Sequence, residues 1–381
     1  MEQTEQDPQK PQATIGSAII GDRRYKILSL FFFRERTFFR LVAFCLFCSA
    51  IFYPYPAIAM WIGFIFAAYS AIANDSIQTI GTFIASNEDR KWWHLWLFIG
   101  AIFLLTSFYS WYQFDGDVSY QRLSSKGFSE SPTSFHFLQL ISPLILLVIT
   151  RLRMPVSTTF MLLSVFSTNT EAILAVTSKS LTGYFVAFGL AILVWYGLSK
   201  WISRLVQGEP HPYWRIAQWT ISGALWSVWI MQDAANIAIF LNRQLTIWEY
   251  IAFAGFIFFG LGLLFYLRGD KIQGIVKEKS SVTDVRAASV IDLVYAFILF
   301  FFKELSTMPM STTWVFLGLL GGREIAMQLT PHAETNRSMK STLFLVFRDA
   351  GFAFIGLFIS MALAVAINPQ IQADLLEMIG W

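Results

Sequence analysis

The sequence predicts an all-α protein that crosses a membrane several times. Only 14% of its 381 residues are charged and 55% are hydrophobic, whereas roughly a quarter of the residues of a soluble domain are charged. Apolar stretches such as 220–241 and 341–367 exceed the ~20 residues that a transmembrane helix requires. These stretches are continuous rather than alternating, so they do not fit a membrane β-barrel.

Polar and basic stretches separate the expected crossings. Residues 1–36 form a polar, basic N-terminal tail, and its first twenty residues are expected to be disordered, with no secretory signal. An extra transmembrane helix is expected at 37–54, before the two halves of the chain. The remaining expected crossings are 57–86, 93–112, 183–204, 216–241, 248–267 and 342–367, followed by a C-terminal tail at 368–381.

Two further apolar stretches, 135–176 and 288–328, are too long for single crossings. Each is interrupted near its middle by a proline that is followed by Ser-Thr-Thr. Proline ends an incoming helix and fits the first turn of the next one. We therefore expect two re-entrant helical hairpins, each entering and leaving on one side of the membrane.

Basic residues predict the orientation. Counting crossings forward from the N-terminus places all basic stretches on one side and the 113–134 loop, which has no basic excess, on the other. The positive-inside rule then predicts a multi-pass plasma (inner) membrane protein with a cytoplasmic N-terminus. The basic residues behind this prediction are Arg23, Arg24, Lys26, Arg34, Arg36, Arg40, Lys200, Arg204, Arg215, Arg268, Lys271, Lys277, Lys279, Arg286, Arg337 and Lys340.

The same count predicts inverted-topology repeats. Residues 57–204 and 216–367 each contain a crossing, a crossing, a hairpin and a crossing. Because three crossings are an odd number, the second copy runs upside down relative to the first. Inverted repeats with interrupted helices are typical of secondary transporters, in which substrate and ions bind at the repeat interface.

Two polar motifs recur in the same order in both halves. The motif Asn-Asp-Ser-Ile-Gln at 74–78 precedes Pro-Val-Ser-Thr-Thr at 155–159. In the second half, Gln-Asp-Ala-Ala-Asn at 232–236 precedes Pro-Met-Ser-Thr-Thr at 309–313, at nearly the same spacing. Repetition of this order indicates an internal duplication.

The Ser-Thr-Thr runs are candidates for binding an oxyanion. A helix that starts within the membrane leaves backbone N–H groups unpaired and carries partial positive charge. Two such starts facing each other, with hydroxyl donors added, suit an oxyanion. The alternative is that the hydroxyls only cap their own helices. The candidate substrate-binding residues are Ser157, Thr158, Thr159, Ser311, Thr312 and Thr313.

The aspartates of the acidic motifs call for a cation. A carboxylate within a membrane helix costs at least about 2.5–3.5 kcal/mol, and it repels a neighbouring oxyanion. A sodium ion held by carboxylate and amide oxygens removes both problems, and a proton on Asp75 or Asp233 would act similarly. The alternative is that the aspartates pair with lysine or arginine. The expected sodium ligands are Asn74, Asp75, Gln78, Gln232, Asp233 and Asn236, and no other cofactor is expected.

Other residues give weaker signals. The net charge of +3 gives no support to nucleic-acid binding. Cys45 and Cys48 lie in an apolar helix and are expected to pack rather than bind metal, and the four histidines are not clustered. Arg151 and Arg153 precede the first Ser-Thr-Thr run, where they either hold an anion or pair with acidic neighbours.

Taken together, the four motifs resemble those of the inorganic phosphate transporter (PiT) family. That family has a G-A-N-D-x-x-N-A-x-G-T type motif and a P-x-S-T-T-H motif in each half. The resemblance implies an inverted-repeat symporter in which aspartates and amides hold sodium and the Ser-Thr-Thr runs hold phosphate; the family also includes sulfate carriers that use protons. The departures from its pattern are Gln78 and Gln232 for asparagine, Ile239 where the first half has Gly81, and Phe160 and Trp314 for histidine.

We therefore expect a secondary-active transporter in the lipid bilayer that carries inorganic phosphate by symport with sodium or a proton. Sulfate is the alternative oxyanion. A channel is a second class that the sequence leaves open, as is a homo-oligomeric assembly. An intramembrane enzyme with Ser157 or Ser311 as nucleophile is a third class, but no histidine or lysine stands at a spacing that would activate either serine. We expect no enzymatic activity.

Overall fold

The computed structural model describes residues 13–14, 17–20, 23–26, 35–125, 127–152, 154–199, 204, 208–267, 284–330 and 338–378. The chain divides into two compact units, Met1–Ile51 and Phe52–Trp381. Several basic residues on which the predicted orientation depends lie outside the described residues, namely Arg34, Lys200, Arg268, Lys271, Lys277, Lys279 and Arg337.

The first unit contains one small sheet and one helix. Three short antiparallel strands pair in the order β1-β2-β3, and the first two lie within the first twenty residues, which the sequence predicts to be disordered. The strands are β1 (Ala13–Thr14), β2 (Ser17–Ile20) and β3 (Arg23–Lys26), and the helix α2 spans Arg36–Phe52. Cys45 and Cys48 of α2 are both free thiols.

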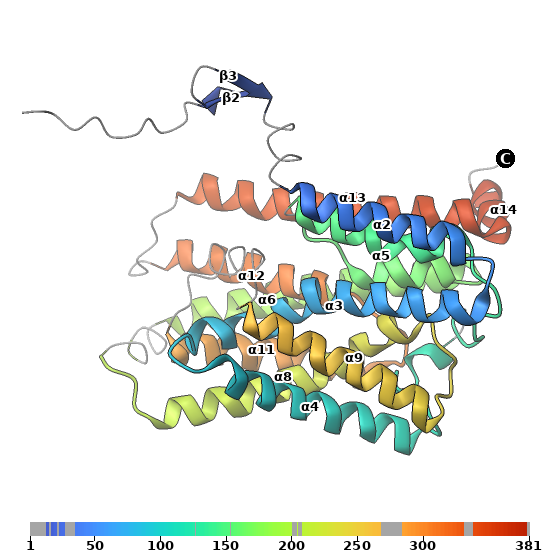
Figure 1. Cartoon of the computed structure of the whole chain (residues 1–381). Helices are drawn as coiled ribbons and strands as arrows, with labels where there is room; N and C mark the ends of the chain where they lie inside the picture. The colour runs from blue at the N-terminus through green and yellow to red at the C-terminus, as the bar shows by residue number, and fades with distance from the viewer. Residues whose placement is uncertain are drawn as a thin grey trace, which may run out of the picture. The chain divides into compact units, whose positions relative to one another are not determined.

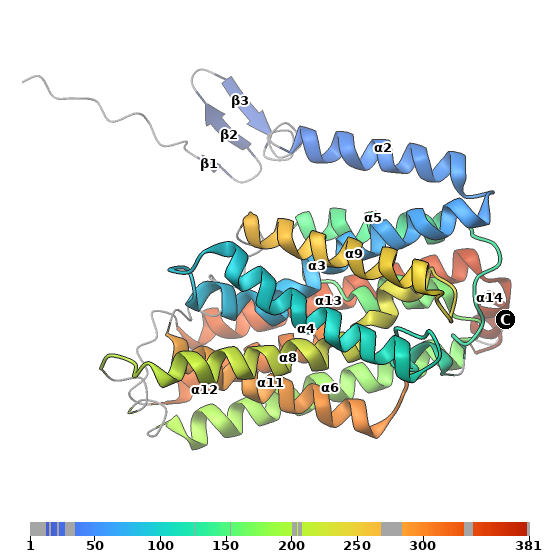
Figure 2. The ribbon, with the colours of Figure 1, turned by 60° about the horizontal axis from the view of Figure 1, so that its bottom comes forward.

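The second unit is a bundle of long helices, with shorter helical turns between some of them (Figures 1 and 2). Its elements in chain order are α3 (Pro56–Ser86), α4 (Trp92–Gln113), η1 (Arg122–Ser124), α5 (Phe137–Arg151), η2 (Thr159–Leu163), η3 (Ser164–Phe166), α6 (Thr170–Gly197), α8 (Tyr213–Ala238), α9 (Ile247–Tyr266), α11 (Val285–Leu305), α12 (Thr312–Leu329), α13 (Met339–Ile367) and α14 (Pro369–Met378).

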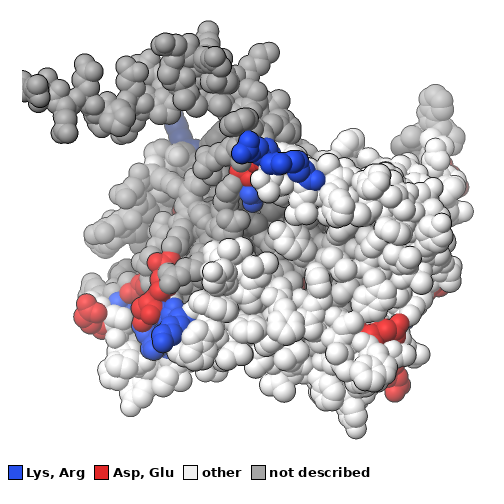
Figure 3. All heavy atoms as spheres, in the orientation of Figure 1, with Lys and Arg blue, Asp and Glu red and all other residues white. Residues whose placement is uncertain are grey.

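The surface of the second unit is that of a membrane protein. Six stretches among the described helices are long and apolar enough to cross a membrane: Pro56–Asp75 of α3, and α4, α6, α9, α11 and α13. Large apolar side chains on them point outward, and Leu105, Phe259 and Phe358 are each about 70% exposed. On the face drawn in Figure 3, charged side chains of this unit gather toward its ends and leave a broad uncharged area between them. Such a surface is suited to lipid rather than water.

Capping residues explain where several helices begin. Thr246 and Glu249 form a capping box at the start of α9, in which Thr246 N donates to Glu249 Oε2 at 2.8 Å. Asn169 caps α6, and its Oδ1 accepts from Ala172 N at 2.9 Å. This cap lies inside the apolar run 135–176, so the segment after the first Ser-Thr-Thr run ends at Phe166 and a separate long helix begins at Thr170. The structure thus differs here from the expected hairpin boundary.

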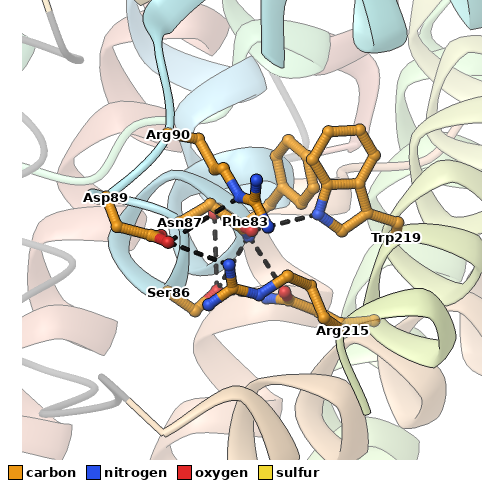
Figure 4. Close-up of polar contacts among 8 residues, drawn as sticks. Phe83, Ser86, Asn87, Asp89, Arg90, Arg215 and Trp219 are labelled. Atoms are coloured by element: carbon orange, nitrogen blue, oxygen red, sulfur yellow. Dashed lines mark hydrogen bonds and ion pairs between the residues drawn. The ribbon is translucent and has the colours of Figure 1, made fainter. Parts of the chain in front are cut away.

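At one end of the bundle, the end of α3 is joined to the start of α8 (Figure 4). Asn87 Nδ2 donates to Gln218 Oε1 at 2.9 Å, and Trp219 Nε1 donates to Asn87 Oδ1 at 3.0 Å. Arg215 adds an ion pair with Asp89, with a distance of 2.8 Å between Nη1 and Oδ2. We call this the α3–α8 end.

The opposite end is formed by the loop after α4 and the start of α9. Leu245 N donates to Gly116 O at 2.9 Å. Gly116 has a φ of 95° and approaches so closely that an added Cβ would lie 2.9 Å from Leu245 N, so both conformation and space require glycine. We call this the α4–α9 end.

The two interrupted segments enter the bundle from different ends. The segment from α5 to η3 starts and finishes at the α4–α9 end, because Arg243 N donates to Ser131 Oγ at 3.0 Å and Thr168 N donates to Gly127 O at 3.2 Å. The segment from α11 to α12 starts at the α3–α8 end, where Arg286 Nη2 donates to the Gly208 carbonyl at 2.9 Å.

Helix α12 then runs back toward the α3–α8 end. It runs in the same direction as α6, since Gly318 meets the Tyr184 carbonyl and Gly322, one turn later, meets the Phe188 carbonyl. A Cβ at Gly318 or Gly322 would lie 2.2 or 2.3 Å from these oxygens. The glycines therefore let α6 and α12 pack backbone to backbone.

Candidate functional site

The four polar motifs meet in the interior of the second unit. Helices α3 and α8 carry the acidic motifs, and the Ser-Thr-Thr runs follow the breaks after α5 and α11. Asp75 and Asp233 are each only 1% exposed. The six hydroxyl residues expected from the sequence are all buried: Ser157, Thr158, Thr159, Ser311, Thr312 and Thr313.

The first acidic motif contacts the first Ser-Thr-Thr segment. Asn74 Nδ2 donates to Asp75 Oδ1 at 2.7 Å and to the Val156 carbonyl at 3.3 Å. The Asp75 carboxyl also interacts electrostatically with the hydroxyls of Thr158 and Thr313, one from each Ser-Thr-Thr run. This aspartate therefore faces both interrupted segments.

The second acidic motif has the corresponding arrangement. Asn236 Nδ2 donates to Asp233 Oδ1 at 2.6 Å and to Thr159 Oγ1 at 3.1 Å. Thr159 Oγ1 in turn donates to the Met310 carbonyl at 3.1 Å and lies 3.4 Å from Asp233 Oδ1. Thr312 is a further hydroxyl that interacts with Asp233. Contacts between the two halves of the chain thus build the site.

The hydroxyls have two different roles. Ser157 Oγ accepts from Phe160 N at 3.2 Å, and Ser311 Oγ accepts from Trp314 N at the same distance. The serines therefore cap the turns that follow, as the alternative interpretation of the sequence held, whereas the threonines face the aspartates. The rings of Phe160 and Trp314 meet edge to face with their centroids 5.4 Å apart, so an apolar pair fills the position next to the hydroxyls.

Several oxygen atoms at the site lack a hydrogen-bond partner among the described residues. The amide nitrogens of Gln78, Gln232 and Asn236 donate to Asp75 Oδ1, the Leu299 carbonyl and Asp233 Oδ1, respectively. Their amide oxygens remain available, together with one carboxylate oxygen and one hydroxyl. The buried, unpartnered oxygens are Gln78 Oε1, Thr158 Oγ1, Gln232 Oε1, Asp233 Oδ2 and Asn236 Oδ1.

These oxygens suit a hard cation. Carboxylate and amide oxygens are the ligands that such ions prefer, and unpaired buried acceptors are otherwise costly. Within the described residues neither Asp75 nor Asp233 forms an ion pair. The structure therefore does not show the alternative arrangement, in which each aspartate pairs with a lysine or an arginine. Nor do three or more His, Cys, Asp or Glu side chains gather there among the described residues, so a cation at this place would have mostly neutral oxygens around it.

Comparison with known proteins addresses the fold. No protein-family model matches the chain, and no curated protein matches it in sequence. A solved structure described as the sodium-dependent phosphate transporter matches 84% of this chain and 99% of its own, with a TM-score of 0.51 and 16% sequence identity. This chain has the fold of that transporter. The match spans most of the second unit's length, which contains all four motifs.

The sequence interpretation missed three charged residues of the bundle, two of them buried and one half-buried. Arg122, from the loop after α4, is 2% exposed, and Lys179 of α6 is half-buried beside it. Asp292 of α11 is 1% exposed and accepts from Thr82 Oγ1 at 2.7 Å and from Ser222 Oγ at 2.5 Å. A charged residue inside an apolar helix is itself a functional signal, and this rule points to Lys179 and Asp292 even without a repeated motif.

Of the two arginines before the first Ser-Thr-Thr run, the structure describes only Arg151. Arg151 is half-buried at the end of α5, and Arg153 lies outside the described residues. Lys303 and Glu304, before the second run, form an ion pair of 2.6 Å with each other. Arg323 likewise pairs with its neighbour Glu324 at 3.0 Å.

Proposed function

We propose that this chain is a secondary-active transporter that carries inorganic phosphate across the plasma membrane together with a sodium ion or a proton. One observation carries the proposal: the aspartates of both acidic motifs face threonine hydroxyls of both Ser-Thr-Thr runs, and the same motifs hold buried, unpartnered oxygens. The transporter fold of the chain supports it independently.

Coupling follows from charge. The cation binds to Asp75 and Gln78 of α3 and to Gln232, Asp233 and Asn236 of α8, and the oxyanion binds between the threonine hydroxyls. Without the cation, a carboxylate about 4 Å from a singly charged anion repels it by about 4 kcal/mol at an effective dielectric constant near 20. Since about 1.4 kcal/mol is a factor of ten, the anion binds about a thousandfold more weakly to the cation-free site.

The proposed architecture is an inverted repeat with two re-entrant hairpins. Its support is that the α5–η3 and α11–α12 segments start at different ends of the bundle and meet at Asp75 and Asp233. Rocking of one group of helices against another would then expose the site to each side in turn. The basic residues near the N-terminus support a cytoplasmic location for that terminus.

Sulfate is the second candidate substrate. The observation that favours it is the apolar pair Phe160–Trp314, which supplies no titratable group beside the hydroxyls. Protonated phosphate needs an acceptor for its own O–H group, whereas sulfate does not. Sites that hydrogen-bond such a group discriminate strongly against analogues that lack it, so competition between the two anions separates the candidates.

An enzymatic role has no support in the site. The hydroxyls of Ser157 and Ser311 accept from backbone N–H groups. In the described part of the chain, no histidine or lysine hydrogen-bonds either serine, so neither hydroxyl has an activating base.

Uptake of labelled phosphate into proteoliposomes tests the proposal, with a sodium gradient, a proton gradient or neither. We expect gradient-dependent uptake that excess sulfate inhibits if both anions share the site. Asp75→Asn and Asp233→Asn should abolish the gradient dependence, whereas Asp89→Asn, an exposed carboxyl paired with Arg215, should not. Absence of phosphate and sulfate uptake under both gradients would overturn the proposal, and flux far above carrier rates without gradient dependence would identify a channel.

A further inference from the structure

Two cationic side chains converge on the break between α11 and α12, residues 306–311, which we call the tip. Lys179 Nζ donates to the Ser306 carbonyl at 3.0 Å and to the Met308 carbonyl at 2.6 Å. Arg122 Nη1 donates to the same Ser306 carbonyl, and its Nη2 donates to the Lys303 carbonyl at 3.4 Å. Two basic groups therefore share one neutral oxygen atom.

Asp233 and Glu304 act on Arg122 from a distance, without a direct contact. Within the described residues neither Arg122 nor Lys179 forms an ion pair, and the remaining Arg122 contact is from Nε to the Met231 carbonyl at 3.3 Å. The nearby carboxyl of Glu304 is already paired with Lys303. Burial lowers the pKa of Arg122 to about 10, against the opposing effect of Asp233 and Glu304, so the guanidinium stays protonated at neutral pH. Like charges this close favour an anion between them.

The same contacts hold the backbone that carries the second Ser-Thr-Thr run. Ser180, next to Lys179, accepts from Ser311 N at 2.8 Å. Thr159 holds the Met310 carbonyl at 3.1 Å. Side chains therefore hold the tip at four positions between 306 and 311. Release of the Lys179 and Arg122 contacts together frees two of them, Ser306 and Met308.

We propose that Arg122 and Lys179 form an anion-capture site at the tip, and that an oxyanion bound there takes over their hydrogen bonds to the Ser306 and Met308 carbonyls and so loosens the tip before the anion moves to Thr312 and Thr313. This inference rests on the proposed transport of an oxyanion. It adds a site at which the anion first binds and a conformational change of the tip that this binding causes.

The chemistry of the pair suits a tetrahedral oxyanion. The planar guanidinium of Arg122 binds two oxygens of such a group, and the ammonium of Lys179 supplies a third donor. Ser306 and Thr307 are exposed, so the tip is open to ligands. Free phosphate and the phosphate group of an anionic lipid share this chemistry, and the experiment must separate them.

The first test compares phosphate uptake by Lys179→Met, Lys179→Arg and Lys303→Met proteins. Lys303 lies in the last turn of α11, just before the tip, but its side chain is paired with Glu304, so it is the matched control. We expect Lys179→Met to raise KM for phosphate about tenfold, the effect of losing one charge-assisted hydrogen bond, with a smaller change in kcat. Lys179→Arg and Lys303→Met should stay within about twofold of the parent. Equal KM values in Lys179→Met and Lys303→Met would overturn the proposal.

The second test reads tip movement without transport. Met310→Cys, a fully buried position, is placed in a Cys45→Ser, Cys48→Ser background and labelled with a water-soluble maleimide. Inorganic phosphate should accelerate labelling of this parent protein severalfold, and Lys179→Met should make labelling fast and independent of phosphate. Labelling that ignores phosphate in the parent would contradict the trigger even if uptake is normal.

The two assays also distinguish failure of the proposed capture site from failure of the proposed symport. Phosphate-dependent labelling without uptake would support the capture site and reject symport. The lipid source is tested by labelling in phosphatidylcholine vesicles with and without phosphatidylglycerol, in the absence of inorganic phosphate. Acceleration by the anionic lipid but not by inorganic phosphate would overturn substrate capture.

Discussion

Removal of a single hydroxyl group should weaken the junction between the two halves of the site. Thr159 Oγ1 donates to the Met310 carbonyl at 3.1 Å and accepts from Asn236 Nδ2 at 3.1 Å. It thus connects the first Ser-Thr-Thr run with the second one and with the acidic motif of α8. Thr159→Val keeps the shape of the side chain and deletes both contacts.

The size of the effect follows from these contacts. The buried Met310 carbonyl is left without its side-chain donor, which costs about 1–3 kcal/mol. Asn236 keeps its 2.6 Å bond to Asp233 but loses the second acceptor, and an interhelical hydrogen bond in a membrane protein contributes about 0.6 kcal/mol. The added methyl group offsets about 0.8 kcal/mol. The free energy of unfolding should therefore fall by about 1–3 kcal/mol.

Thermal unfolding of the detergent-solubilised protein measures this change, with and without sodium. A ligand at a hundred times its Kd stabilises the folded state by about 2.7 kcal/mol. We expect Thr159→Val to lower Tm by several degrees and to reduce the sodium-dependent increase. Thr182→Val is the matched control, because the exposed Thr182 hydroxyl donates only to the Ser178 carbonyl of its own helix, at 2.9 Å. A Thr159→Val protein as stable as Thr182→Val would refute the reasoning.

Two further substitutions test the packing around the site. Asp292→Leu should lower the free energy of unfolding by about 2–6 kcal/mol, because the hydroxyls of Thr82 and Ser222 each lose a buried acceptor. Asp292→Asn should lower it less. Equal Tm values for Asp292→Leu and the parent would contradict the structural role of Asp292. Gly318→Ala should reduce both stability and uptake, because its Cβ would lie 2.2 Å from the Tyr184 carbonyl. Gly189→Ala, with open space around that Cβ, is the control in the same Tm and uptake measurements.

The sequence predicts the long helices and the meeting of the motifs for separate physical reasons. Lipid demands continuous apolar helices, so composition alone indicates most of the long elements. The repeated Asp and Ser-Thr-Thr motifs are costly inside apolar segments, so their recurrence marks a shared interior site. Their contacts across the chain, such as Thr159 with Asp233 and Met310, agree with that prediction.

Other features depend on contacts that no local pattern reveals. Asn169 is a single cap inside a long apolar run, and missing it extends the first hairpin past its true end. The sequence places Lys179 just after the expected hairpin. In the structure it lies near the start of a separate helix, α6. Arg122 lies in a polar loop, where arginine is ordinarily solvated, and only the arrival of the tip beside it explains its burial. Long-range packing supplies that information, and hydropathy does not.

The distribution of polar contacts also suggests which helices move together. Side chains join α3, α8 and α11 in three successive layers: Asn87 with Gln218 and Trp219, Asp292 with Thr82 and Ser222, and Gln232 with the Leu299 carbonyl. Helices α6 and α12 are instead held by backbone approach at glycines. The side-chain hydrogen bonds therefore join α3, α8 and α11 into one body. The close glycine contact joins α6 and α12 into a second body. The threonine contacts lie at the boundary between these two bodies. The contacts of Lys179 with the tip lie at the end of α11. Exchange of the site between the two sides of the membrane would therefore break the few bonds around Asp75, Asp233 and the tip, and leave the three polar layers intact.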